Sequence, residues 1–167
     1  MHQIGDKIIY GAVGVMTIVD IREESIGDIS RSYYVLKATL TNSDSLTFVP
    51  ADNERLVAFM HPLLSKDELA ELIRRADKVE PLLWIEGNRQ RTEYFKRVME
   101  SGDRLSIYAM IRASDESEQR RISEGKKNFI SDEAARQKAR KLLNSEISVV
   151  FDIPEDDVDA FIKNIAE

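Results

Sequence analysis

Cysteine and histidine, two residue types that often perform nucleophilic or acid–base chemistry, are absent or scarce in this chain of 167 residues. It contains no cysteine and only two histidines, His2 near the N-terminus and His61 beside Pro62. Without cysteine there are no disulfides, thiolate nucleophiles or cysteine-based zinc sites, and the composition suits a reducing compartment. A Ser/His/Asp arrangement would have to use His61, and no nucleophile-elbow glycines accompany it. We therefore expect no catalytic residue and no enzymatic activity.

Phosphate-binding and metal-binding motifs are also missing. Gly5, Gly11 and Gly14 are too widely spaced for a P-loop or a dinucleotide fingerprint, so we interpret them as turn residues. The acids near the C-terminus lack the alternating ligands and the glycine of an EF-hand loop. Those acids are Asp152, Glu155, Asp156, Asp157 and Asp159. We expect no metal, no cofactor and no small-molecule substrate, and a hydrolase using these clustered carboxylates is the weakest functional alternative.

Charge is distributed unevenly along the chain, whose net charge is −6. Residues 1–62 hold five basic and eight acidic side chains, and residues 152–167 hold one lysine and six acids. The segment 63–151 carries 18 basic and 16 acidic residues, a balance of +2. Because non-specific nucleic-acid affinity comes mainly from cations that neutralise phosphates, a nucleic-acid surface would have to lie in this middle segment.

Three basic clusters lie within that segment. On a helix predicted over residues 89–100, one face opposite the apolar side has a net charge of +2 and holds Arg89, Glu93, Lys96 and Arg97. The second cluster is Arg136, Lys138, Arg140 and Lys141, and the third is Lys126 and Lys127. Such faces either contact phosphates or are simply solvated, and the pattern alone leaves both interpretations open.

Trp84 is the only tryptophan, and it lies in a break bounded by Pro81 and Gly87, next to the first basic helix. An exposed aromatic ring flanked by cations could stack on a base or enter a minor groove as a wedge. With apolar neighbours on both sides, the ring could equally cover the helical core.

Two kinds of element must position these residues. Ile-, Val-, Tyr- and Thr-rich segments at 7–10, 13–23, 32–40 and 45–49, separated by Gly, Asn, Asp and Ser, predict short strands. Their close spacing predicts a small, strongly bent antiparallel barrel of the SH3 or Tudor type over residues 1–60. An all-α domain is expected over residues 61–167.

Helix starts in the second part are marked by capping residues. Ser65 can cap a helix whose first turn holds Asp67 and Glu68, acids that interact favourably with a helix N-terminus. Asp103 can cap the helix that begins at residue 104. Helices are predicted over about 66–76, 89–100, 104–113, 131–147 and 155–165, with a polar interval over 114–127. No apolar run reaches the roughly 20 residues that span a bilayer, and we expect a soluble, cytoplasmic protein without membrane contact.

An ordered set of motifs runs through the chain: Ile4-Gly5-Asp6, Tyr10, Gly14, Tyr34-Val35-Leu36-Lys37 and Val49-Pro50-Ala51-Asp52-Asn53. Ser101-Gly102-Asp103 and the segment from Ala139-Arg140 to Glu146 continue it into the helical part. This series resembles the CarD/CdnL family of bacterial transcription regulators over most of residues 3–150. The resemblance implies a Tudor-like domain that binds the RNA polymerase β subunit. It also implies a helical domain that contacts the promoter DNA minor groove near the melted region, modulates open-complex stability and has no catalytic activity.

The resemblance also indicates site residues. Glu24 and Phe48 stand where well-studied members have polymerase-facing arginines, and with Ile26 they form the predicted polymerase-binding residues. The family's wedge tryptophan corresponds to Asn88, with Trp84 four residues earlier. The predicted DNA-binding residues are Trp84, Asn88, Arg89, Arg91, Lys96, Arg97, Lys126 and Lys127. The alternative function is a protein-binding adaptor that docks on polymerase or another partner without DNA contact.

Overall fold

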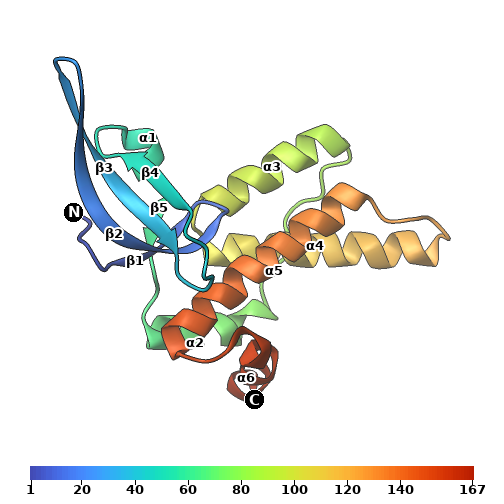
Figure 1. Ribbon diagram of the computed structural model, residues 1–167. Coiled ribbons are helices and arrows are strands. Elements are labelled where there is room, and N and C mark those ends of the chain that lie inside the picture. Colours follow the sequence, from blue (N-terminus) through green and yellow to red (C-terminus); the bar gives the residue numbers. More distant parts are fainter.

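The computed structural model describes residues 1–167, in which an antiparallel sheet is followed by a helical region (Figure 1). This confirms the predicted fold class. The strands are β1 (Lys7–Tyr10), β2 (Gly14–Ile26), β3 (Ile29–Ala38), β4 (Leu46–Pro50) and β5 (Met60–Pro62). Their order in the sheet is β4-β3-β2-β1-β5, so β4 and β5 form the two edges.

All four predicted strands are present, and the fifth strand, β5, was not predicted. With three residues, one of them proline, β5 is too short to show a periodic pattern, and it is held by pairing with β1. β2 and β3 are longer than predicted because they meet in a tight turn at Gly27-Asp28, where Gly27 has φ +63°. The predicted division at residue 60 stays a prediction, and β5 spans it.

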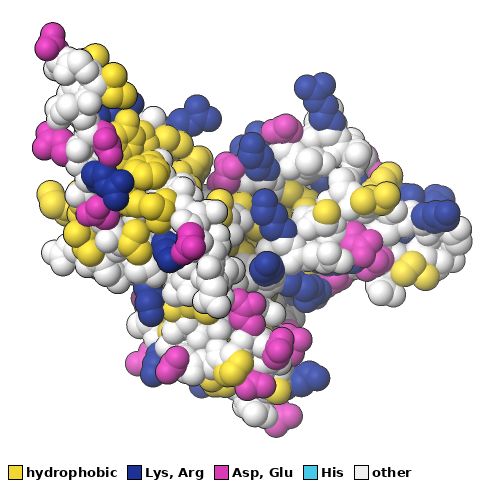
Figure 2. All heavy atoms as spheres, in the orientation of Figure 1, with side chains coloured by type: hydrophobic (Ala, Val, Ile, Leu, Met, Phe, Trp, Pro, Cys, Tyr) yellow, Lys and Arg dark blue, Asp and Glu magenta, His cyan; other side chains and the backbone are white.

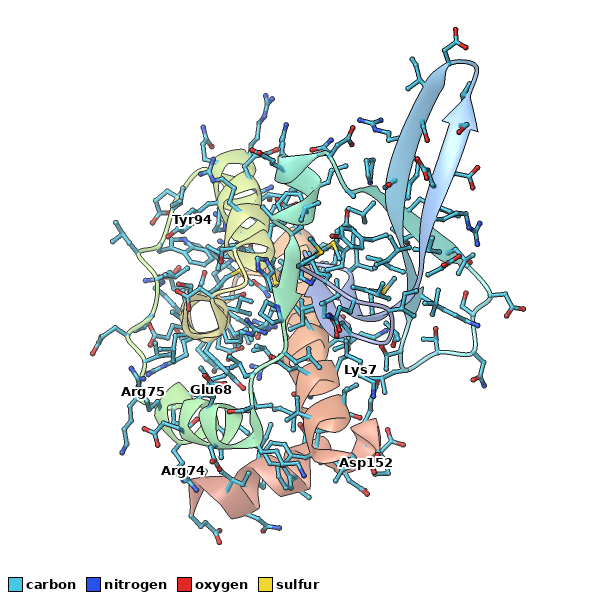
Figure 3. All side chains as sticks on the ribbon, turned by 90° about the vertical axis from the view of Figure 1, so that its left-hand side faces the viewer. Lys7, Glu68, Arg74, Arg75, Tyr94 and Asp152 are labelled. Atoms are coloured by element: carbon cyan, nitrogen blue, oxygen red, sulfur yellow. The ribbon has the colours of Figure 1, made fainter.

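The β2–β3 hairpin extends beyond the rest of the sheet (Figures 1 and 3). Nearer its base, a β-bulge between Ile18 and Asp20 shifts the register. Ile8, Met16, Ile18, Leu36, Val49 and Met60 form the buried core on one face of the sheet. Leu56 and Val57 of the short helix α1 (Glu54–Val57), capped by Asn53, pack against this core.

The helical region contains α2 (Lys66–Ala76), α3 (Asn88–Glu100), α4 (Arg104–Ser123), α5 (Ile130–Phe151), η1 (Glu155–Asp157) and α6 (Val158–Ala166). The predicted caps at Ser65 and Asp103 are present. The predicted end of α4 near residue 113 is wrong, because the helix continues ten residues further to Ser123. Its polar continuation is held by α5, since Asp115 and Glu118 form ion pairs with Arg136.

Two apolar clusters hold the helices together. α3, α4 and α5 share a core that also includes Ile9 and Val15 from the sheet. α2 and α6 pack with the C-terminal half of α5 around Leu69, Ile147 and Val158. α6 therefore packs on the body at the end of the molecule opposite α3 (Figure 1), and its acids do not cover the basic face of α3. None of the helices has the length and apolar character needed to cross a membrane.

Candidate functional site

Glu24, Ile26 and Phe48 lie on one face of the sheet. Side chains alternate along a strand, and the pairing of Asp20 with Val35 and of Val35 with Phe48 places the even-numbered residues from Asp20 to Ile26 on the face that carries Phe48. The Arg22 guanidinium confirms this, because its carbon lies 5.6 Å from the centre of the Phe48 ring. The structure therefore places the three residues predicted to bind polymerase on one face, spread along the hairpin from the level of Phe48 to Ile26 near its tip.

This face presents apolar surface to solvent. Phe48 is 43% exposed and packs edge-on against Tyr33, with the ring centres 6.2 Å apart. Ile26 is 81% exposed at the end of the hairpin, beside Ile29 across the turn. Figure 2 shows hydrophobic side chains gathered over this part of the sheet. The charged side chains of Arg22 and Glu24 lie on the same face between Phe48 and Ile26, so the exposed apolar groups are separate.

β4 adds a second docking feature because it is a free edge. It pairs with β3 on one side and with no strand on the other. Backbone donors and acceptors on such an edge can bind an extended segment of a partner by adding a strand. Phe48 lies in the middle of this edge strand, so backbone pairing and aromatic contact are available at the same place.

The exposed cations of α3 form a separate surface. Arg89, Lys96 and Arg97 are exposed and make no ion pair, and Figure 2 shows basic side chains along this helix. Lys126 and Lys127 are exposed in the loop between α4 and α5, where Lys126 pairs with Glu124 at 2.8 Å. These five residues are placed where phosphate contacts are sterically possible. We call the surface of Arg89, Lys96, Arg97, Lys126 and Lys127 the basic surface.

Arg91 does not belong to the basic surface, which corrects the prediction that it contacts DNA. Its side chain is 0% exposed, and its Nε and Nη2 atoms each donate to an oxygen of Asp132 at 2.8 Å. Nη1 donates to the carbonyl oxygens of Ile85 at 2.8 Å and of Glu86 at 3.2 Å, and Nη2 also donates to the side-chain oxygen of Asn88 at 3.0 Å. A guanidinium with these partners has no donor left for a phosphate.

Trp84 covers the helical core in this structure. Its ring is half-buried, packs edge-on against Phe95 at 6.2 Å between centres, and stacks on the Arg91 guanidinium at 4.4 Å. Phe129 lies 4.9 Å from the same guanidinium carbon, so two aromatic rings flank Arg91. Asn88 is exposed, but its amide oxygen accepts hydrogen bonds from Arg91 and from Ser131. Both residues thus help to fix the N-terminal ends of α3 and α5.

The second predicted basic cluster is divided by ion pairs. Arg136 is buried between Asp115 and Glu118, and Arg140 pairs with Asp115 at 2.7 Å. Only Lys138 and Lys141 of that cluster remain unpaired and exposed. The acids come from α4, in the interval predicted as polar, and no spacing rule links them to α5.

A network at the junction holds the two surfaces in a fixed relation. His61 of β5 shares a hydrogen bond of 2.9 Å between Nε2 and the carbonyl oxygen of Glu100, at the end of α3. Arg104 donates to the buried carboxylate of Glu146 and, through Nη2, to the carbonyl oxygen of Pro62 at 2.9 Å. Sequence reasoning placed Arg104 at a helix start but could not identify Glu146 as its partner.

Comparison with known proteins identifies the β domain. Residues 2–63 match the family model described as the CarD-like/TRCF RID domain, a range that begins before β1 and ends after β5. Among curated proteins, none matches the chain. Domains of this family interact with RNA polymerase and are not enzymes, so the match supports a transcription-related function. The part of the chain that is similar to the CarD-like/TRCF RID domain is therefore residues 2–63, which include the whole sheet.

Proposed function

We propose that the chain is a transcription regulator that binds the RNA polymerase β subunit through β4 and the sheet face around Phe48. The helical domain then contacts promoter DNA in the minor groove near the melted region and modulates open-complex stability. The observation that carries the proposal is the free edge of β4, which combines an unpaired backbone with the exposed Phe48 ring. Glu24 and Ile26 extend this docking face along the hairpin.

The polymerase half can be tested with the isolated β subunit and the full chain. The intact chain should bind at micromolar concentration or tighter, and Phe48→Ala should weaken binding about tenfold or more, because buried aromatic anchors dominate such interfaces. Ile122→Ala is a matched control, since this exposed residue lies on α4, remote from the sheet. No binding by the intact chain would refute the proposed docking.

For the DNA half, we propose phosphate contacts from the basic surface. The chain has a net charge of −6, so its intrinsic affinity for DNA is low. Docking on polymerase offsets this, because tethering raises the effective concentration of the basic surface at the promoter. Arg89, Lys96 and Arg97 are the main proposed contacts because none of them is paired within the protein.

Salt dependence distinguishes this proposal from a protein-binding adaptor. In polymerase–promoter complexes, the triple variant Arg89→Gln/Lys96→Gln/Arg97→Gln should reduce the slope of log affinity against log salt by about 2 to 3 if all three contact phosphates. Lys138→Gln/Lys141→Gln on α5 is the control for a general change in charge. A promoter effect that does not change with salt, in both the intact chain and the triple variant, would favour the adaptor.

Trp84 can serve as a minor-groove wedge only by leaving its contacts with Arg91 and Phe95. Trp84→Ala should therefore lower the free energy of unfolding by about 3 kcal/mol, as expected for a packed aromatic side chain. Measurement of thermal unfolding together with open-complex lifetime separates the two roles. A shorter lifetime with unchanged stability would identify Trp84 as the wedge.

A further inference from the structure

A groove lies where α2, α4, α5 and α6 meet, away from both the sheet face and α3 (Figure 1). Its volume is about 600 Å³, within the range of about 300 to 1,000 Å³ typical of small-molecule sites. The apolar residues that line it are Ile73, Ala76, Ile111, Leu143 and Ile162, one or more from each of the four helices. An apolar group of side-chain size can be buried against them.

Some charged groups of the groove are already satisfied within the protein. Arg112 donates to the carbonyl oxygens of Asp77 and Val79, at 3.0 and 2.6 Å, at the C-terminal end of α2. Arg140 donates to the carboxylate of Asp115 at 2.7 Å. These two arginines have protein partners and serve mainly to join α4 to α2 and to α5.

A second set of polar groups has no partner. The carboxylates of Asp77 and Asp159, the ammonium of Lys163 and the amide of Asn144 line the groove without any ion pair or side-chain hydrogen bond. Asp77 lies at the end of α2, Lys163 and Asp159 on α6, and Asn144 on α5. The groove thus offers a free carboxylate on α2 and, on α6, a free carboxylate and a free ammonium one helical turn apart, all exposed to solvent at the edge of an apolar floor.

Tyr108 adds a neutral donor. Burial raises the pKa of its hydroxyl to about 12, so the group remains protonated throughout the physiological range. The hydroxyl makes no hydrogen bond within the protein, although Asp77 and Arg140 are both close enough to affect its titration. An uncharged O–H group beside the Asp77 carboxylate can donate to an acceptor on a bound molecule.

We infer that this groove binds a zwitterion with an apolar side chain, of the size of a free amino acid or a dipeptide. The six ionisable lysine, arginine and aspartate side chains of the groove comprise three acids and three bases, so it has no net charge to attract a simple anion or cation. The ligand's ammonium group is bound by Asp77 on α2, and its carboxylate by Lys163 on α6 and Asn144 on α5. The apolar side chain packs on Leu143 and Ile111. This site does not depend on polymerase docking, so it can be tested separately.

Titrations of the full-length chain, followed by amide chemical shifts in NMR spectra, test the inference. The probes are L-phenylalanine and L-leucyl-L-phenylalanine, whose relative affinities distinguish an amino-acid site from a dipeptide site. Saturable shifts should concentrate at Ile111, Leu143 and Ile162. N-acetyl-L-phenylalanine and L-phenylalanine amide, which each keep one charge, should bind about fivefold more weakly or worse, the loss of one ion pair. Absence of saturation at millimolar concentrations, or equal binding by the single-charge analogues, would overturn the inference.

Variants assign the binding to this groove. Asp159→Asn/Lys163→Gln should weaken binding about fivefold or more, while Lys138→Gln on the exposed face of α5 should leave it unchanged. If the α6 variant alters the spectrum around Val158, Asn144→Ser provides a second test on a different helix, α5. Unchanged affinity in a variant whose spectrum shows the native fold would place the binding elsewhere and contradict the assignment.

Discussion

Arg91 shows how a charged side chain can be a core residue. Its guanidinium is enclosed by Trp84 and Phe129 and bonded to both oxygens of Asp132, which is itself 2% exposed. Transferring such a pair out of water is costly, and the pair persists because every donor finds an acceptor. The residue joins two regions that are distant in the sequence: the break around Trp84 with α3, and the loop before α5 with α5 itself.

Removing one member of this pair should be far more damaging than removing both. Arg91→Met leaves the Asp132 carboxylate buried without a partner, and we expect a loss of about 3 to 5 kcal/mol in the free energy of unfolding. The double variant Arg91→Met/Asp132→Leu should recover much of that loss. Urea denaturation measures both, and Lys96→Met on the exposed face of the same helix is the control, within about 0.5 kcal/mol of the parent. A single variant as stable as the parent would contradict the structural role.

Asp152 is the only residue other than glycine with a positive φ, 53°, and it caps the C-terminal end of α5 (Figure 3). Its negative charge lies where the helix dipole is also negative. Asp152→Asn keeps the tolerance for this conformation and removes the charge, so stability should rise by about 0.3 to 1 kcal/mol. Asp157→Asn should instead lower stability, because it removes a negative charge from the N-terminal end of α6, where the helix dipole is positive. Thermal unfolding of both variants at low salt tests the pair.

At the scale of elements, α2 depends on a local device. The Ser65 hydroxyl accepts from the backbone N–H of Glu68, and the Glu68 carboxylate accepts from the backbone N–H of Ser65 at 2.8 Å. Ser65→Ala should therefore cost about 1 kcal/mol, measured by chemical denaturation. Lys66→Ala in the first turn is the control, because its side chain takes no part in the cap.

The same device gives a pH dependence with a defined sign. Its hydrogen bonds with Ser65 lower the pKa of Glu68 below the ordinary value of 4.5. A carboxylate whose pKa is lower in the folded state stabilises the fold above its unfolded-state pKa and loses this contribution as the pH falls through the folded-state pKa. Glu68→Gln can still accept the hydrogen bond but cannot titrate. As the pH falls from about 5 to 3, the free energy of unfolding of this variant should therefore decrease less than that of the parent. The midpoints of urea denaturation at each pH measure the difference.

Features of the fold that depend on neighbouring residues could be predicted from the sequence. Features that depend on partners distant in the sequence could not. Strands β1 to β4, the caps at Ser65 and Asp103 and the start of α3 could be predicted from nearby residues, because each depends on periodicity or on a bond within a few positions. The extension of α4 and the burial of Arg91 depend on Arg136 and Asp132, which lie tens of residues away. Helical periodicity placed α3's apolar face correctly. It could not show that Arg91 of that helix forms a buried ion pair with Asp132 of α5.

At the scale of the whole molecule, the turn at Gly102 between α3 and α4 lies directly against His61 of β5. Gly102 has φ +73°, and a side chain there would place its Cβ 2.6 Å from the His61 ring. Gly125 has nearly the same φ, +71°, but open space around it. Gly125→Ala should therefore lower the free energy of unfolding by about 1 kcal/mol, which is the conformational cost alone. Gly102→Ala should lower it distinctly more and should shift the NMR signals around His61. An equal loss of stability in the two variants would mean that the turn at Gly102 can move away from His61 at little energetic cost.

The junction of His61, Arg104 and Glu146 has a consequence for promoter architecture under the proposed function. These hydrogen bonds connect the sheet to the helical region, so the distance between the docking face and the basic surface is fixed by the protein. That distance cannot change to suit the spacing of sites on the DNA. Each base pair inserted between the polymerase anchor and the contacted site turns the groove by about a tenth of a helical turn. Regulation should then vary with helical phase, weakening over a few inserted pairs and recovering incompletely after a full turn.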